Sequence, residues 1–514
     1  MSTDLNKAIG HEKRIAAITN ACEEFDHWHT EKHNIELQLG CSNVLTLVLS
    51  MTEDEDEIRM LCSALEMVYR ASTSMVSKIF KEGSDVVPLL LKLLERCETS
   101  YQKHTEISIL NITKVLLYFS RVSELRVHLA RHRGMLDTLT RVGYLTLNDD
   151  CRILQMRVIA NLSNEEENKA MMMNHDGLLD TILKIAALDV CDKAREYASA
   201  SLMDLASSTE TQVSMADHDK LLSTLVKLAV TEDKEETREY AVTAMQNLAF
   251  SKDNRERLVT YGDGVIVESL KKTLSVDNNE KSRRRAAGAL TNLACEETAE
   301  LLATHKGLVE ILSRVATHDK NDDVQKRASL ALTKIASSCP NDSQSFETTM
   351  NALVIAATSP NSTGIPAVFR VKARTASRRS EMVRIPGLIE CLAEMSTSPS
   401  YSSKDRDNAT RAIMHLTNEG ENRKIMCNKV VLRALLEASN LEGSEHIETR
   451  DSALVAIERL ATEVSNRQYM ARHEGLLVAV AKATERESRS ELAGEKNTQP
   501  RLAKQLLMSL LLAM

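Results

Sequence analysis

The sequence predicts an all-α fold built from short helical repeats that stack on one another. A helical pattern recurs with one period along most of the chain, and glycine corners recur in the same register. Aromatic residues make up only 3% of the 514 residues, with 16 Gly and 7 Pro, which is sparse for an all-β protein with its frequent turns. These observations together predict an α-solenoid.

The repeating unit is clearest at residues 283–312, and Asn292 serves as its origin. Small or apolar residues precede and follow this origin in steps of 3, 1, 3 and 1, as on one face of an amphipathic helix: Ala286, Ala289, Leu290, Leu293 and Ala294. A break follows at Glu296–Thr298, and Gly307 stands just before an apolar run. The unit is therefore expected to be a long helix, a turn, a short helix, a glycine corner and another helix.

The same template fits at steps of 43, 43, 45, 42 and, after a gap, 44 residues. Its origins are Asn161, Asp204, Asn247, Asn292, Lys334, His415 and Arg459, with weaker matches at Met67 and Tyr118. Seven residues after the origin stands a set of polar residues that we interpret as N-caps of the short helix: Asn168, Asn254, Asn341, Asn422 and Asn466.

Two parts of the chain break this pattern. Residues 340–400 have room for one more unit, but the segment after Ser359 shows no apolar stripe in register. We expect a degenerate repeat there, with a loop near Ser359–Pro366. Residues 1–50 are expected to form a helical cap, residues 51–482 the repeats, and residues 483–514 a polar linker and a C-terminal capping helix.

The motifs ALTNLA at 289–294, AMQNLA at 244–249 and VIANLS at 158–163 resemble those of the armadillo-repeat family. The resemblance covers roughly residues 51–482. It implies a right-handed superhelix of about nine to ten three-helix repeats with atypical terminal caps. It also implies that the third helices line a concave groove, where Asn side chains contact the backbone of an extended peptide.

The Asn at the origin is only partly retained along this chain. Asn161, Asn247 and Asn292 carry it, whereas Lys334 and His415 replace it in later repeats, as do Asp204 and Arg459. Asn can donate to and accept from a peptide backbone at once, which suits an extended ligand. The alternative is that an Asn here only ties its helix to the neighbouring repeat, and the sequence leaves both roles open.

The residues seven and eight positions before the origin change along the chain. A repeated REYA motif places Tyr197 and Tyr240 there, and basic residues follow in the next two repeats. A further basic run lies in the degenerate repeat, at Arg370, Lys372, Arg374, Arg378, Arg379 and Arg384. The candidate partner-binding residues are Asn161, Tyr197, Tyr240, Asn247, Arg284, Arg285, Asn292, Lys326, Arg327, Lys334, Arg411 and His415.

Because Arg binds carboxylates and phosphates through a planar fork, these positions suggest a groove for an acidic segment. The rival interpretations are a solvated face and a nucleic-acid site, although the aromatic residues that would stack on bases are missing. Nuclear-import adaptors of the family carry Trp four residues before the Asn. The single Trp of this chain, Trp28, lies outside the repeats, so the sequence does not favour an import adaptor. With a net charge of −8, the chain has no overall positive electrostatic field that would attract nucleic acids.

No pattern typical of catalysis appears: there is no P-loop, GxGxxG, GxSxG or kinase signature. The ten Cys are scattered singly, and the His-rich run at 26–33 lacks the HExxH order of a zinc site, so we expect no metal and no cofactor. The sequence RTAS at 374–377 resembles the site of a kinase that prefers basic residues.

The N-terminal residues contain no apolar signal region, and the longest apolar run, 506–514, is too short for a membrane span. We therefore expect an intracellular protein, cytoplasmic or nuclear or both. The predicted function is a non-catalytic scaffold that binds an extended, partly acidic segment of a partner protein in its groove. The alternatives are a regulator that wraps a folded partner such as a small GTPase, and an adaptor subunit of a ubiquitin ligase.

Overall fold

The computed structural model describes residues 55–70, 76–77, 86–99, 103–145, 148–341, 344–492 and 502–511, together with residues 13, 16, 45 and 49. These residues are helical or lie in the turns between helices, and none of them is in a strand. They contain no helix long and apolar enough to cross a membrane. The chain divides into two compact units, residues 1–254 and 255–514, which are described separately.

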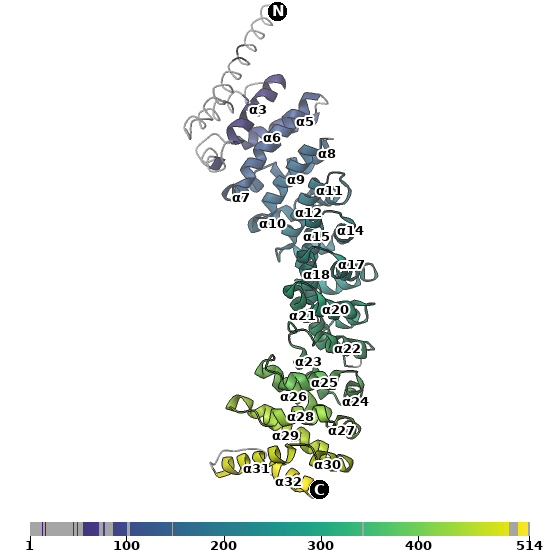
Figure 1. The fold of residues 1–514 in the computed structure, drawn as a ribbon. Helices are drawn as coiled ribbons and strands as arrows, with labels where there is room; N and C mark the ends of the chain where they lie inside the picture. Colours follow the sequence, from purple (N-terminus) through teal and green to yellow (C-terminus); the bar gives the residue numbers. More distant parts are fainter. Residues whose placement is uncertain are drawn as a thin grey trace, which may run out of the picture. The chain divides into compact units, whose positions relative to one another are not determined.

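Unit 1 consists of helices that follow one another with short connections (Figure 1). It contains α3 (Glu55–Arg70), α5 (Val87–Thr99), α6 (Lys103–Arg121), α7 (Ser123–Arg131), α8 (Met135–Leu145), α9 (Asp149–Ser163), α10 (Glu166–Met173), α11 (Leu178–Leu188), α12 (Asp192–Ala206), α13 (Gln212–Asp217), α14 (Leu221–Thr231) and α15 (Glu235–Leu248).

The boundary between the units falls within α16 (Lys252–Thr260). Unit 2 continues with η1 (Tyr261–Gly264), α17 (Val265–Val276), α18 (Glu280–Leu293), α19 (Ala299–Thr304), α20 (Leu308–His318), α21 (Asp322–Ser338), α22 (Phe346–Ala356), α23 (Ile365–Arg374), α24 (Ala376–Arg384), α25 (Leu388–Thr397), α26 (Ser403–Leu416), α27 (Gly420–Met426), α28 (Lys429–Ser439), η2 (Ser444–His446), α29 (Ile447–Thr462), α30 (Val464–Ala471), α31 (Leu476–Leu492) and α32 (Leu502–Leu511).

The unit predicted around Asn292 is confirmed. Its long helix is α18, its short helix is α19, and the helix after the corner is α20. Gly307 forms the corner with φ +74, a left-handed conformation that a side chain would strain. Leu293 is 1% exposed, so the predicted apolar face is the buried one.

The helices that carry the origins, which we name the ladder helices, pack in sequence within each unit. In unit 1 they are α3, α6, α9, α12 and α15, and in unit 2 they are α18, α21, α23, α26 and α29. At the apolar positions of the template, Ala198, Ala241, Ala286 and Ala328 are fully buried. Small Ala side chains let neighbouring helices approach closely, while Leu and Ile fill the space between them.

The interpretation of the Asn seven residues after the origin as an N-cap is wrong. Asn168, Asn254, Asn422 and Asn466 lie inside their short helices and are buried. The Nδ2 of Asn422 donates to the carbonyl of Leu416 in its own repeat (3.0 Å) and to that of Arg379 in the preceding repeat (3.1 Å). Asn168, Asn254 and Asn466 donate in the same way, so this Asn joins two repeats from the inside.

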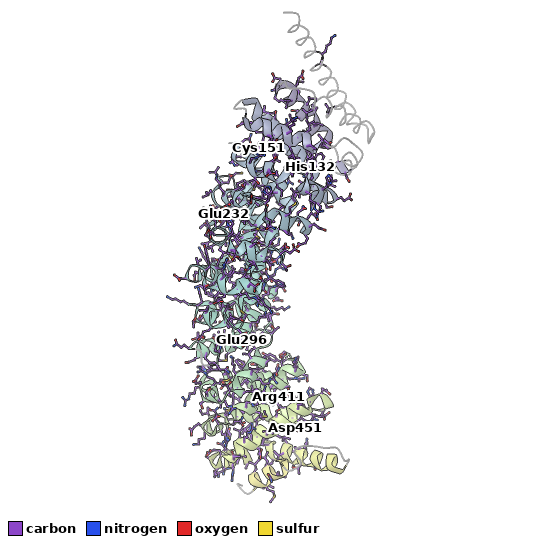
Figure 2. The ribbon with its side chains drawn as sticks, turned by 180° about the vertical axis from the view of Figure 1, so that it is seen from behind. His132, Cys151, Glu232, Glu296, Arg411 and Asp451 are labelled. Atoms are coloured by element: carbon purple, nitrogen blue, oxygen red, sulfur yellow. The ribbon has the colours of Figure 1, made fainter. Side chains whose placement is uncertain are left out.

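A second connection between elements uses the Arg nine residues before the origin. Arg283 at the start of α18 forms a two-pronged ion pair with Asp319, the residue that ends α20. Arg195 pairs in the same way with Glu232 at the end of α14, and Glu232 is labelled in Figure 2. Arg152 pairs likewise with Asp189 at the end of α11. These pairs fix the start of a ladder helix to the end of the helix that follows the short helix of the same repeat.

The degenerate repeat is in register after all, with Val371 as its origin. Its ladder helix α23 buries Ile365 and Phe369, and Lys372 occupies the slot that is apolar in the other repeats. Lys372 is 3% exposed, and its Nζ donates to the carbonyl of Cys339 (2.6 Å) and to Asn341 Oδ1 (3.1 Å). Because Lys372 interrupts the apolar stripe of α23, the sequence pattern did not reveal this repeat. The loop expected near Ser359–Pro366 is present, and α23 begins after it at Ile365.

At the end of unit 2, α31 continues to Leu492, so the segment expected to be a linker from residue 483 is helical as far as that residue. The last helix, α32, packs against α29, α30 and α31. Leu506 and Leu510 of α32 are buried. The final repeat is thus covered by a helix of the chain itself.

Candidate functional site

Several of the residues at the origin donate hydrogen bonds to the preceding repeat. Asn247 Nδ2 donates to the carbonyl of Met203 (3.2 Å), and Asn161 Nδ2 donates to Ser120 Oγ (2.9 Å). The substitutes behave alike: Lys334 Nζ donates to Thr291 O (3.3 Å), and Arg459 Nη1 donates to Met414 O (2.8 Å). Their hydrogen bonds match the tying role that the sequence left open, and Asn161 and Asn247 remain partly exposed.

In unit 1 the face of the ladder helices carries the two Tyr of the REYA motif. The Arg157 guanidinium of α9 lies 5.6 Å from the ring centre of Tyr197 on α12. Burial raises the pKa of Tyr240, and the neighbouring carboxylates, Glu196 first, raise it further. Tyr240 therefore lies near carboxylates, whereas Tyr197 lies near a guanidinium group, and both Tyr are partly exposed.

In unit 2 the predicted basic residues Arg284, Arg285, Lys326 and Arg327 lie on the neighbouring ladder helices α18 and α21. Arg284 forms a long ion pair with Asp323 of α21 (3.7 Å), and both side chains are more than a third exposed. Lys326 is exposed, and Arg285, Asn292 and Arg327 are partly exposed. Unit 2 thus holds these basic residues and Asn292, whereas Asn161, Tyr197, Tyr240 and Asn247 belong to unit 1.

A further group of positive charges lies farther along unit 2 and acts on His415 of α26. The pKa of His415 is lowered to about 4, first by burial and then by Arg374, Arg379, Arg459 and Arg370. Arg370 and Arg374 come from α23, Arg379 comes from α24, which follows α23 directly, and Arg459 comes from α29, two repeats farther along the chain. We name Arg370, Arg374, Arg379, His415 and Arg459 the basic cluster.

Few anions compensate the basic cluster. Arg379 pairs with Glu419 (2.8 Å), but Arg370 and Arg374 form no ion pair with any residue that the structure describes. The Nε of Arg370 is buried without a hydrogen-bond partner among those residues. Burial, followed by Arg423 and Arg379, lowers the pKa of Arg459, although Glu458 acts in the opposite direction. The cluster is therefore a partly buried region of unbalanced positive charge.

The other predicted basic residues of this region have different surroundings. The guanidinium of Arg378 lies 4.6 Å from the ring centre of Phe346 and donates to the carbonyl of Asn341. Arg411 pairs with Asp407 of its own helix (2.9 Å) and with Glu448 of α29; Arg411 on α26 and Asp451 on α29 are labelled in Figure 2. Arg411 is thus largely neutralised, and we do not place it in the cluster.

The sequence pattern placed Arg370, Arg374 and Arg379 in a basic run and His415 among the candidate residues. It did not associate this run with His415 or with Arg459, because they occupy different slots of the repeat. Arg459 and His415 stand at origins, whereas Arg370 and Arg374 stand one residue before and three residues after the origin Val371. Finding Val371 through the spacing of 44 residues to His415 would have placed Arg370 and Arg374 on a ladder helix. Their approach to His415 depends on how α23 packs against α26.

The described residues contain no group of three or more His, Cys, Asp or Glu side chains that could hold a metal ion. The His-rich run at 26–33 lies outside the described residues. Among the side chains that the structure describes, seven Cys are free thiols. Burial raises the pKa of Cys391 to about 12 and that of Cys427 to about 11. Neither Cys391 nor Cys427 has the lowered pKa of a reactive thiol.

No family model matches the sequence, and no curated protein matches it. Solved structures do match. A crystal structure of an engineered protein covers 91% of this chain and 98% of its own, with 20% identity and a TM-score of 0.51. A structure from a study of the phosphorylation switch that controls the interaction between cadherin and beta-catenin covers 96% of this chain and 97% of its own, with 15% identity and a TM-score of 0.55.

A designed armadillo-repeat protein in complex with a (KR)4 peptide aligns with 48% of this chain at 21% identity, with a TM-score of 0.40 that is too low to bear on the fold. The structure from the study of cadherin and beta-catenin matches over nearly the whole chain, and the described helices repeat as the sequence motifs predict. The chain therefore has the armadillo-repeat fold.

Proposed function

We propose that this chain is a non-catalytic scaffold that binds an extended, acidic segment of a partner protein along the ladder helices of unit 2. The observation that carries the proposal is the basic cluster, in which four Arg lower the pKa of the half-buried His415 and two of those Arg have no ion-pair partner in the described part of the chain. Carboxylates of a ligand would supply the missing negative charge, and the planar guanidinium groups suit them.

The neighbouring helices extend this surface. Arg285, Lys326 and Arg327 lie on α18 and α21, which precede α23 in the row of ladder helices. Exposed Leu330 and Val371, which are 40% and 46% exposed, stand on α21 and α23 among these charges. An acidic segment with an occasional apolar side chain would match this surface. The similarity to a structure from work on the interaction between cadherin and beta-catenin agrees with a protein ligand.

The test measures binding of a fluorescent polyglutamate peptide by anisotropy. The double variant Arg370→Glu with Arg374→Glu should bind about tenfold more weakly than the unmodified chain, since exposed ion pairs contribute roughly 0.2–1 kcal/mol each. The variant Arg285→Glu with Arg327→Glu tests α18 and α21 separately. Arg314→Glu with Arg433→Glu is the matched control, because it makes the same charge change on exposed positions of α20 and α28.

Two further readouts locate the ligand. Added salt should weaken binding, because exposed charges are screened beyond about 8–10 Å at 0.1–0.15 M. An anion in the basic cluster should raise the pKa of His415, so binding near pH 5 should take up protons, measured by calorimetry in two buffers. Equal binding by the cluster variant and the control would rule out this site. Tighter binding of DNA than of polyglutamate would assign the surface to nucleic acid instead.

A further inference from the structure

The residue in the slot six positions after the origin is acidic in five of the ten repeats. In four repeats this residue is a carboxylate in the first turn of the short helix: Glu124, Glu167, Asp253 and Glu421. In a fifth repeat it is Glu210, which lies just before the short helix α13. In the other five it is Thr73, Thr298, Pro340, Ser377 or Ser465. In the repeat of Val371 the slot holds Ser377, and the first turn of α24 has no acidic residue. A negative charge at this end of a helix is stabilising because it faces the positive end of the helix dipole.

Ser377 is also the only Ser of the chain with Arg three residues before it. That residue, Arg374, is exposed, and so is Ser377. The Ser377 hydroxyl makes no hydrogen bond to any described residue, whereas the neighbouring Thr375 hydroxyl accepts a hydrogen bond from Asn341 Nδ2 (3.0 Å). Thr375 has an extended backbone between α23 and α24, at φ −78 and ψ 114. Of the two hydroxyls, Ser377 is the accessible one.

We propose that Ser377 is a phosphorylation site for a protein kinase that recognises Arg three residues before the acceptor, and that the phosphate occupies the slot held by Glu or Asp in other repeats. In the reaction the Ser377 oxygen forms a bond to the γ-phosphorus of ATP while the bond from that phosphorus to the bridging oxygen breaks. ADP leaves, and the hydroxyl proton passes to the catalytic carboxylate of the kinase.

The phosphate would act on two parts of unit 2. At the start of α24 it accepts hydrogen bonds from first-turn N–H groups, which have no partners within the helix. It also adds nearly two negative charges between Arg374 and Arg379 in the sequence, and both of these belong to the basic cluster. Phosphorylation of Ser377 therefore weakens binding of the acidic segment, because the phosphate neutralises the positive charge of the basic cluster. This inference rests on the proposed function.

The first experiment treats the folded full chain with ATP and the catalytic domain of an Arg-directed kinase, and maps phosphate by mass spectrometry. Ser377 should be modified, and Arg374→Ala should slow this modification several-fold. Ser465 is an internal control, because it is exposed in the same slot of another short helix but has Thr462 three residues before it. Failure to modify Ser377 in the folded chain, or equal rates in Arg374→Ala, would overturn the proposal.

A second readout, hydrogen exchange, is independent of any ligand. Amide exchange in α24 should slow in the phosphorylated chain and stay unchanged in Ser377→Ala treated in parallel. Unchanged exchange in a chain shown to carry the phosphate would refute the acidic-slot argument.

The third measurement concerns regulation. Phosphorylation, or Ser377→Glu, should weaken polyglutamate binding several-fold, whereas Ser223→Glu, on an exposed position of α14 in unit 1, should not. Equal binding by Ser377→Glu and Ser223→Glu would exclude the regulatory effect. If the unmodified chain binds no polyglutamate, the proposed function fails, while mass spectrometry and hydrogen exchange still decide whether Ser377 is the site.

Discussion

Arg283 and Asp319 face each other through two parallel hydrogen bonds, Nε to Oδ2 at 2.7 Å and Nη2 to Oδ1 at 3.0 Å. The two side chains are 14% and 7% exposed, so the pair is mostly out of water. Arg283 Nη1 also donates to the carbonyls of Asp277 (2.9 Å) and Asn278 (3.1 Å). One side chain thus fixes the end of α20 and the turn before α18 to the start of α18.

Removing Arg283 should therefore destabilise unit 2 strongly. Arg283→Ala leaves Asp319 buried without its partner, and breaking such a pair costs about 3–5 kcal/mol. Urea unfolding followed by circular dichroism measures the loss. Arg433→Ala is the control, because the ion pair of Arg433 with Glu437 is exposed and should contribute less than about 1 kcal/mol. Equal losses in the two variants would show that the Arg283 pair does not hold these elements together.

Asn422 should contribute more to stability than its polar character suggests. Its Nδ2 is the donor for the carbonyls of Leu416 and Arg379, and Asn422→Ala leaves both without this donor. A buried group without a partner costs about 1–3 kcal/mol, and Asn422 is 1% exposed. Asn278→Ala, at an exposed position of unit 2, should change stability by less than about 0.5 kcal/mol. A negligible effect of Asn422→Ala in urea unfolding would contradict the role we assign to it.

Leu293 tests whether damage stays local in a repeat protein. Leu293→Ala removes buried methyl groups and should cost about 2–5 kcal/mol. Because each repeat contacts only its neighbours, hydrogen exchange should accelerate in α17–α21 far more than in α26–α30. The unmodified chain provides the reference rates. Acceleration spread evenly over unit 2 would contradict this locality.

Asp204 should make unit 1 less stable at neutral pH than at acidic pH. Burial raises the pKa of its carboxyl from 3.8 to about 6, despite opposing effects of Lys169, Ser163 and Arg126. Between those values the folded state holds more protons than the unfolded state, so stability falls as pH rises through this window and stays lower above it. Asp204→Asn should stabilise the protein by about 1–3 kcal/mol above pH 6.

Thermal unfolding near pH 4 and near pH 7.5 measures this difference. The gain from Asp204→Asn should appear at the higher pH and largely vanish at the lower one, where Asp204 is already protonated in the folded state. Asp219→Asn, at an exposed position of the same unit, should give no such pH-dependent gain. A gain from Asp204→Asn that is the same at both pH values would exclude ionisation of Asp204 as its cause.

Much of the fold could be predicted because the signals are local. The steps of 3 and 1 around Asn292 determine which side of α18 is apolar, and Leu293 and Ala286 are buried as that pattern requires. Gly307, Gly177 and Gly475 stand at corners with positive φ, where only the backbone conformation matters. The sequence pattern did not identify the repeat of Val371, because Lys372 stands at the position where an apolar residue was expected.

The candidate site was only partly predictable. Arg284, Arg285, Lys326 and Arg327 stand on adjacent ladder helices, as their spacing predicts, whereas the association of Arg370 and Arg374 with His415 could not be read from the repeat. The buried Asn422 looked like a cap because Asn favours helix starts and its position is near one. Its actual partner, the carbonyl of Arg379, lies 43 residues away in the sequence.

The sequence by itself determined the period, the helices, the corners and the buried face, since helix periodicity and glycine conformation act within a few residues. The tertiary structure decided which polar groups interact: Asn422 with Arg379, Arg283 with Asp319, and the basic residues with His415. The physical reason is that a hydrogen bond or an ion pair depends on distances of a few ångströms between side chains of different repeats. Those distances follow from how the helices pack, and the repeat pattern of a single chain does not contain them.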